Sequence, residues 1–193
     1  MYKSLKQYCC KIVSFTPSEL QLIDLFFKPL TLNKKKFLLE GGGVCDFIAF
    51  ISQGVIRHFH VKDGVEKTCD ISFENNWVTD FHSFTKGSPS IMNLQALHTT
   101  TLLIIRKEDL TKLYKTCNKY ETFGRLMAEQ VAQRATEIAM SLSSEKPEER
   151  YMNLMGKNPD LLQRIPQKYI ANYLGISAES LSRIRKRMSK RKS

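Results

Sequence analysis

The sequence lacks the features that mark membrane, secreted and disulfide-bonded proteins. Its 193 residues contain no run of about 18 apolar residues, so we expect no transmembrane helix. Residues 1–10 have no apolar core of the signal-peptide kind, which predicts a cytoplasmic protein with no membrane partner. The five cysteines are odd in number and mostly scattered, and this favours reduced thiols over a disulfide framework.

Common catalytic motifs are absent as well. The sequence has no phosphate-binding P-loop, no nucleophile elbow, no HExxH zinc motif and no dinucleotide fingerprint. Each of these motifs supplies a specific arrangement of phosphate-binding backbone, nucleophile or metal ligands, and nothing in the chain replaces them. We therefore do not expect an enzyme, and we predict no cofactor.

Positive charge is abundant and unevenly distributed. The net charge is +11, and residues 145–193 hold twelve basic and five acidic residues, a net of +7. The other 144 residues carry a net of only +4. The basic side chains are densest at the end of the chain, at Arg183, Arg185, Lys186, Arg187, Lys190, Arg191 and Lys192. Charge concentrated in this way favours a polyanionic partner, and a solvated basic tail is the alternative.

The first half of the chain changes from helical to strand-like patterns. Residues 1 to about 30 are expected to be helical, because residues 16–19 (Thr-Pro-Ser-Glu) have the proline and the acid of a helix start. Residues 31–106 hold short apolar runs separated by turn residues. Within them Asp63-Gly64 predicts a hairpin, and the apolar run 102–105 predicts a buried strand. Many short strands at this spacing predict a β-roll or barrel.

A helical period begins after Lys107. Residues from about 119 to 143 contain no proline and carry an apolar stripe, whose members are Phe123, Met127, Val131, Ala135, Ile138 and Leu142. So long an amphipathic helix needs a cover for its stripe. We expect the same helix of a second copy, which would make these residues a homodimer interface, and packing on the roll is the alternative. A hinge at 144–147 and short helices around 148–155 and 158–163 complete the pattern.

Residues 165–188, IPQKYIANYLGISAESLSRIRKRM, have the spacing of a helix-turn-helix. Gly175 falls where the turn requires a positive φ, and the small Ala171 falls where two crossing helices come close. Ser177 can cap the second helix, and Glu179 complements its positive end. The two helices are expected to pack together through apolar residues, with Ile176 in the turn and Ile170, Leu174, Leu181 and Ile184 between the helices.

The outward face of the second helix then carries Ala178, Glu179, Ser182 and Arg183. A glutamate can accept a hydrogen bond from cytosine N4, and an arginine can donate two to guanine. An ordinary helical hairpin would have an equally charged outer face, but the turn glycine, the packing positions and the basic flank together favour a DNA-binding unit.

Residues 165–188 resemble the DNA-binding motif of the Crp/Fnr family of bacterial regulators, and the order of elements over nearly the whole chain is similar. The resemblance implies an α+β fold. It places a sensory β-roll of the cyclic-nucleotide-binding type, a jelly-roll-like double-stranded β-helix, at 1–118. A dimerisation helix follows at 119–144, and an all-α helix-turn-helix domain at 145–193. The implied function is sequence-specific transcription regulation on a palindromic operator.

The resemblance also implies which residues contact DNA. A Glu and an Arg four residues apart read bases in that family, and Glu179 and Arg183 match them by position. The member that binds cyclic AMP has a further base-reading Arg where this chain has Ala178, which leaves the operator sequence open. The family's C-terminal wing is missing before Ser193, and we expect the basic tail to take over its phosphate contacts. The complete set of predicted DNA contacts is Gln167, Lys168, Ser177, Ala178, Glu179, Ser180, Ser182, Arg183, Lys186 and Arg187.

Family members that bind cyclic AMP resemble one another in a phosphate cassette, Gly-Glu followed about ten residues later by Arg-Ser or Arg-Thr. Aligned back from the strand at 102–105, these pairs fall on Thr79-Asp80 and Ser90-Ile91. Since no cation replaces the Arg, a phosphate would lose its main charge-assisted bond, and cyclic AMP is not expected to bind. Lys86 in the intervening loop is the alternative cation. The predicted effector pocket, for an unknown small molecule, is Thr79, Asp80, Phe81, His82, Ser90 and Ile91.

Other chemistries and roles compete with this prediction. Iron–sulfur members of the family carry clustered cysteines, whereas in this chain only Cys9 and Cys10 are adjacent. His58 and His60 alternate on a predicted strand, where metal or haem ligation competes with plain surface or packing roles. Phe81, His82 and Phe84 could line a cavity or belong to the core.

The expected partners are double-stranded DNA, a second copy and RNA polymerase. The alternative function is a ligand-binding or adaptor module whose helix-turn-helix contacts protein, which salt-dependent DNA binding would distinguish.

Overall fold

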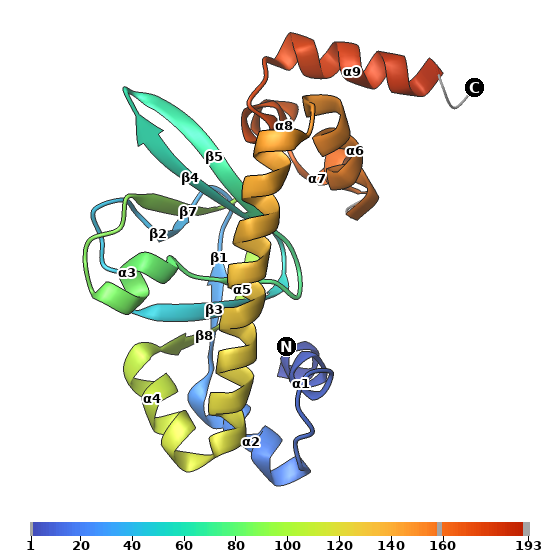
Figure 1. Cartoon of the computed structure of the whole chain (residues 1–193). Coiled ribbons are helices and arrows are strands. Elements are labelled where there is room, and N and C mark those ends of the chain that lie inside the picture. Colours follow the sequence, from blue (N-terminus) through green and yellow to red (C-terminus); the bar gives the residue numbers. More distant parts are fainter. Residues whose placement is uncertain (1, 158–159, 191–193) are drawn as a thin grey trace. The chain divides into compact units, whose positions relative to one another are not determined.

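The computed structural model describes residues 2–157 and 160–190, and the chain divides into two compact units, Met1–Glu129 and Gln130–Ser193. The first unit begins with helices α1 (Tyr2–Cys10) and α2 (Pro17–Phe26). Two β-sheets follow, interrupted by the short helix α3 (Phe81–Lys86), and then α4 (Lys107–Thr116) leads into α5 (Asn118–Ser144), within which the division falls (Figure 1). None of the helices among the described residues combines the length and apolar composition that crossing a bilayer requires.

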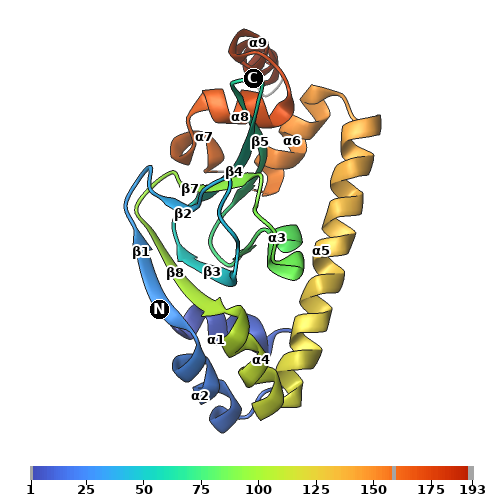
Figure 2. The ribbon, with the colours of Figure 1, turned by 90° about the vertical axis from the view of Figure 1, so that its left-hand side faces the viewer.

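The strands of the first unit form two four-stranded antiparallel sheets. One has the order β1-β8-β3-β6, with β1 (Lys28–Leu32), β8 (Thr100–Arg106), β3 (Phe47–Gln53) and β6 (Trp77–Val78). The other has the order β2-β7-β4-β5, with β2 (Phe37–Leu39), β7 (Met92–Ala96), β4 (Ile56–Lys62) and β5 (Val65–Ser72). Neighbouring strands are mostly distant in sequence, which is the arrangement of a jelly-roll-like β-roll (Figure 2). The predicted α+β fold class is confirmed.

The predicted hairpin at Asp63-Gly64 is present between β4 and β5. Lys62 pairs with Val65, so only two residues form the turn. Their φ angles are 52° and 74°, and two positive φ angles are those of a type I′ turn, whose twist matches the flanking strands. The glycine takes this conformation without steric cost, and aspartate tolerates it better than most residues.

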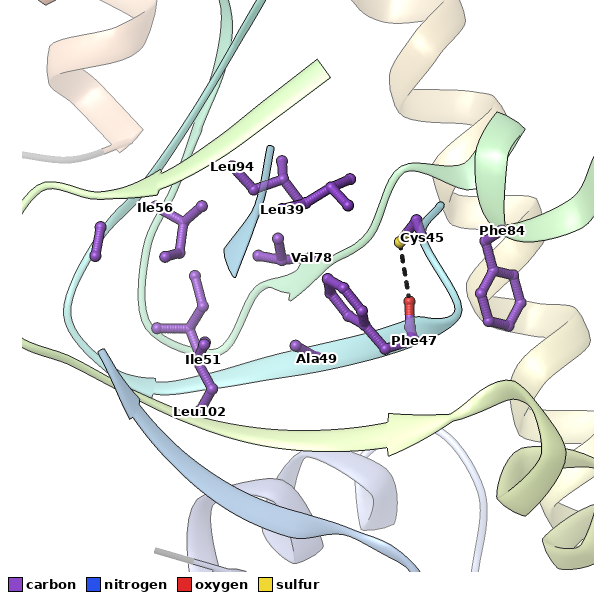
Figure 3. Close-up of a cluster of buried hydrophobic side chains, with 11 residues drawn as sticks. Leu39, Cys45, Phe47, Ala49, Ile51, Ile56, Val78, Phe84, Leu94 and Leu102 are labelled. Atoms are coloured by element: carbon purple, nitrogen blue, oxygen red, sulfur yellow. Dashed lines mark hydrogen bonds between the residues drawn. The ribbon is translucent and has the colours of Figure 1, made fainter. Parts of the chain in front are cut away.

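Apolar side chains fill the space between the sheets. Figure 3 shows residues from both sheets and from α3 pointing into it, among them Phe47, Leu94 and Phe84. Cys45 belongs to the same cluster, is 1% exposed, and donates a hydrogen bond from Sγ to the Phe47 carbonyl. Phe84 is therefore a core residue, which decides between the two interpretations of this side chain. Most residues of β3 and β8 are buried or half-buried, because both faces of these strands are covered, and the buried strand predicted at 102–105 is part of β8.

A second, largely aromatic cluster lies where α1 and α2 pack on the other face of β3 and β8. Phe50, Trp77 and Phe123 surround Tyr8 with edge-to-face contacts at 5.5–6.4 Å between ring centres. Thr16 caps α2 through a capping box with Glu19, as the sequence pattern indicated. The expectation that helix continues to about residue 30 is wrong, because α2 ends at Phe26 and β1 begins at Lys28. Pairing of β1 with β8 determines the conformation there.

The second unit is all helical within its described residues. After the end of α5 it contains α6 (Pro147–Lys157), α7 (Leu161–Arg164), α8 (Gln167–Leu174) and α9 (Ala178–Lys190). The short helix expected at 158–163 corresponds to α7, and residues 158 and 159 lie outside the described part of the chain, as do Arg191 and Lys192 of the predicted basic tail. The pair α8 and α9 is the predicted helix-turn-helix.

Candidate nucleic-acid interface

The turn between α8 and α9 is built on Gly175. Its φ is 70°, in the left-handed region that glycine adopts without strain. Its N–H bonds to carbonyls of the last helical turn, and the N–H of Ile176 reaches back to the Ala171 carbonyl at 3.0 Å. This is the hydrogen-bond pattern of a Schellman motif, which satisfies carbonyls that the end of a helix would otherwise leave unpaired. The turn thus directs the chain into α9 at a defined angle.

The packing between the two helices agrees with the sequence register. Ile170, Leu174 and Leu181 are fully buried, and Ala171 and Ile184 nearly so. Ile176 is half-buried in the turn, as expected. Burial of five apolar side chains at these positions holds α9 against α8 and determines which face of α9 is turned outward.

The N-terminus of α9 is capped as the sequence indicated. The Ser177 hydroxyl accepts a hydrogen bond from the Ser180 N–H at 3.1 Å and donates one to the Ser180 hydroxyl at 3.2 Å. Bonds from its own backbone N–H and from Ser177, together with the charge of Arg183, hold the pKa of Glu179 below its usual range. Glu179 is therefore an ionised acceptor at neutral pH.

The side chains of the predicted base-reading face are on the surface. Ala178, Glu179, Ser182 and Arg183 are all exposed on α9. Of the other predicted DNA contacts, Gln167, Lys168, Ser177, Lys186 and Arg187 are exposed, whereas Ser180 is half-buried. The base-reading face of α9 thus presents one acidic and one basic side chain, Glu179 and Arg183, beside the small Ala178 and Ser182.

Two interactions of this unit have no signal in the sequence. Arg187 forms an ion pair with Glu148 of α6. Arg150 of α6 donates hydrogen bonds to two backbone carbonyls, those of Glu145 and Leu174. The Arg187–Glu148 and Arg150–Leu174 contacts join segments more than twenty residues apart, and the Arg150–Glu145 bond crosses the start of α6. Neither a helical period nor a sequence motif would therefore have predicted these contacts.

In the β-roll, two of the predicted pocket residues bond to each other. Asp80 caps α3, where one carboxylate oxygen accepts from the N–H groups of His82 and Ser83. Its other oxygen accepts from the hydroxyl of Ser90, which is 4% exposed, at 2.5 Å. Asp80 and Ser90, which align with the phosphate cassette, therefore already form hydrogen bonds within the chain.

The remaining predicted pocket residues do not converge on the roll interior. Phe81 and His82 are exposed on α3, and Ile91 is 77% exposed. Thr79 is half-buried and donates its hydroxyl to the Phe47 carbonyl at 2.8 Å. The prediction of a pocket formed by all six residues therefore differs from the structure, since a helix cap and a short loop turn three of them outward. Lys86 is exposed too.

The two strand histidines have partners other than a metal. His58 Nε2 lies 3.0 Å from the Ser72 hydroxyl, and His60 Nδ1 lies 3.2 Å from Cys69 Sγ. Within residues 2–157 and 160–190, no group of three His, Cys, Asp or Glu side chains is placed to hold a metal ion. These contacts favour the packing role of both histidines.

The apolar stripe of α5 splits into two parts. Phe123 is 7% exposed inside the aromatic cluster, and the Tyr8 hydroxyl donates to the half-buried Met127 at 3.6 Å. Phe123 therefore lacks the free surface that a dimer contact needs, and its place in the predicted interface is corrected. Further along, Val131 and Leu142 are 49% and 60% exposed, Ala135 is exposed and Ile138 half-buried.

No protein-family model and no curated protein matches the sequence, but solved structures do. FixK2 from Bradyrhizobium japonicum superposes with a TM-score of 0.74 at 13% identity, over 86% of this chain and 85% of that one. The Thermus thermophilus catabolite activator protein superposes with a TM-score of 0.56 at 20% identity, over 92% of this chain and 85% of that one. A structure described as a putative transcriptional regulator of the Crp/Fnr family from Eubacterium rectale has a TM-score of 0.64 at 18% identity, over 92% of this chain and 85% of that one.

The fold is thus that of a protein with a β-roll, a long connecting helix and a C-terminal helix-turn-helix. It is the Crp/Fnr type of fold, as the sequence resemblance predicted. At these identities the likeness establishes the fold, and the function has to be argued from the residues.

Proposed function

We propose that the chain is a sequence-specific DNA-binding transcription regulator of the Crp/Fnr type that binds a palindromic operator as a homodimer. The observation that carries this proposal is the outer face of α9. Glu179 and Arg183 lie four residues apart and exposed on a helix whose Leu181 and Ile184 are buried. Residues with this spacing are neighbours on a helix surface, so both can reach adjacent base pairs from one groove.

Charge supports the same assignment. The unit that contains α9 belongs to the strongly basic part of the sequence, and its exposed Lys168 and Lys186 can contact phosphates while Glu179 and Arg183 contact bases. Phosphate contacts position a protein on DNA without reading sequence, and base contacts supply the preference. A regulator acting in this way would work with RNA polymerase as its further partner.

Selection of bound fragments from random DNA by the purified protein tests the proposal directly. We expect an enriched palindrome with two half-sites about one helical turn apart, and an affinity that falls steeply with salt. Enrichment of no sequence, with binding indifferent to salt, would instead favour the adaptor alternative. The selected operator then serves the variant measurements below.

Arg183→Ala should weaken binding to that operator by ~1–3 kcal/mol and relax the preference at one base pair. Arg185→Ala is the matched control, since it removes the same charge from the same helix. Arg185 is half-buried and lines a pocket with Tyr151 and Met155, and two residues along the helix it points about 200° away from Arg183. We expect the control to weaken binding about equally for all sequences. Equal losses on specific and random DNA for Arg183→Ala would contradict a base-reading role.

The proposed homodimer uses the exposed part of the α5 stripe, Val131, Ala135, Ile138 and Leu142. A second copy would cover this surface, which water otherwise contacts. Sedimentation should give a dimer at micromolar concentration, and Val131→Asp with Leu142→Asp should shift it to monomer. A wild-type monomer both with and without DNA would exclude this part of the proposal.

We further propose that cyclic AMP is not the effector. A buried phosphate monoanion without a cation costs several kcal/mol, and the positions where a cation and a glycine would hold it contain Ser90 and Thr79. The carboxylate of Asp80 beside Ser90 would also repel it. Calorimetric titration with cyclic AMP should give no heat at millimolar nucleotide. A dissociation constant of tens of micromolar that Lys86→Ala abolishes would show that Lys86 supplies the cation.

A further inference from the structure

Arg150 connects three segments of the second unit. It lies half-buried on α6, and its guanidinium donates from Nη1 to the Glu145 carbonyl at 2.8 Å. From Nη2 it donates to the Leu174 carbonyl at 2.7 Å. Glu145 directly follows α5, and Leu174 is the last residue of α8. One side chain therefore bridges the end of the long helix and the first helix of the helix-turn-helix.

The chemistry of this contact suits an arginine. The last carbonyls of an α-helix have no partner within the helix and carry its partial negative charge. A guanidinium supplies several donors in a rigid plane and a full positive charge, so it can bind two such carbonyls at once. A lysine ammonium has no such planar fork and suits this paired geometry less well.

The side chain of Glu145 continues the connection on the other side. Its carboxylate accepts from the Ser141 hydroxyl in the last turn of α5 at 2.6 Å and from the Asn153 amide of α6 at 3.2 Å. We call Ser141, Glu145, Arg150 and Asn153 the hinge cluster. It ties α5, α6 and α8 together at the point where the sequence predicted a hinge, so rotation there would break several hydrogen bonds together.

We propose that Arg150 is a positioning residue that fixes the helix-turn-helix against the end of α5, and so sets the distance between the two α9 helices of a dimer. This inference rests on the proposed function. A dimer reads two half-sites about 34–36 Å apart only if both recognition helices are held at that separation. The contact of each α9 with its own half-site depends on the exposed face of α9, which Arg150 does not touch. Arg150 therefore controls spacing, and Arg183 controls sequence.

The test compares Arg150→Leu with wild type on three DNA probes, namely the selected palindrome, a single half-site, and palindromes whose spacer is one or two base pairs longer or shorter. We expect unchanged affinity for the half-site. Affinity for the palindrome should fall by roughly ten- to a hundredfold, the factor that corresponds to hydrogen bonds made by a charged group. The dependence on spacer length should become nearly flat. Arg150→Lys, which keeps the charge and can donate to one of the two carbonyls, should recover part of the spacing preference.

Arg125→Leu is the matched control, because it removes an exposed arginine of α5 whose ion pair is with Glu129, away from the hinge cluster. It should retain the wild-type spacing profile. A wild-type profile in Arg150→Leu would overturn the inference, and so would parallel losses on half-site and palindrome, which indicate a damaged domain. If wild type itself selects no palindrome, the proposed function has failed, and that result is distinct from either outcome. Arg150→Lys decides the matter if Arg150→Leu does not fold.

Discussion

In the β-roll, Asp80 bonds to Ser90 and to the backbone of α3, whereas on α9 the side chains of Glu179 and Arg183 are exposed to solvent. The two regions differ in how they use polar groups of similar kind. A polar group bonded inside the chain stabilises the fold and is not available to a ligand, while one held on a rigid exposed face adds little stability and can bind a partner. Substitutions should therefore affect stability in the roll and binding on α9.

The largest contrast is expected between two glycines. A Cβ on Gly54 of the roll would lie 2.4 Å from the Thr100 hydroxyl and 2.7 Å from its Cα, at a φ of +107°. Gly54→Ala should thus combine backbone strain with overlap and cost about 3–5 kcal/mol. Gly175 has a φ of +70° but open space around its Cβ position, so Gly175→Ala should cost only about 1–2 kcal/mol. Urea unfolding measures both, and equal costs would contradict this explanation.

Removing the internal carboxylate is the next test. Asp80→Ala deletes the cap of α3 and leaves the buried Ser90 hydroxyl only the longer bond to the Met92 carbonyl, at 3.3 Å, which together should cost about 1–3 kcal/mol of unfolding free energy. Affinity for the selected operator should not change. Asp46→Ala is the control, since its ion pair with Arg106 is exposed and contributes at most about 1 kcal/mol. A large loss of DNA affinity with little loss of stability would reverse the assignment of roles.

The smallest effect concerns pH. Burial, with the neighbouring Cys10, raises the pKa of the Cys9 thiol to about 12. The unfolded chain then loses this proton near pH 9 while the folded chain keeps it, so unfolded protein binds fewer protons and stability falls as pH rises above about 9. At pH 10 this amounts to about 1.4 kcal/mol. The slope of unfolding free energy against pH should be shallower in Cys9→Ala, and identical slopes in the two proteins would mean that the Cys9 thiol is not the responsible group.

The sequence predicted best those features whose signals are local. The helix-turn-helix could be located because Gly175, Ala171 and Ser177 have fixed places within about twenty residues. The hairpin at Asp63-Gly64 and the strand at 102–105 were found for the same reason. Each depends on φ angles or on a period that neighbouring residues determine, and tertiary packing did not override them.

Features that depend on distant partners could not be predicted. The stripe of α5 looked uniform, yet Phe123 packs against residues of α1 and Met140, outside the predicted stripe, is 65% exposed. Nothing near Asp80 in the sequence shows that one of its carboxylate oxygens accepts from Ser90, ten residues later. The partners of Arg150 and Arg187 are likewise determined by how helices meet, which a single sequence does not record.

The contact between the chain's first helices and the start of α5 has a consequence for folding during synthesis. Lys119 bonds to Glu19, and the Tyr120 hydroxyl to the Glu19 carbonyl, about a hundred residues away in sequence. At about 5–20 residues per second, a ribosome needs roughly 5–20 s to pass from Phe27 to Phe123. During that interval Leu5, Ile23 and Phe27 lack the α5 side of their core and remain partly uncovered. The α8–α9 pair, whose contacts are local, can form as soon as it emerges.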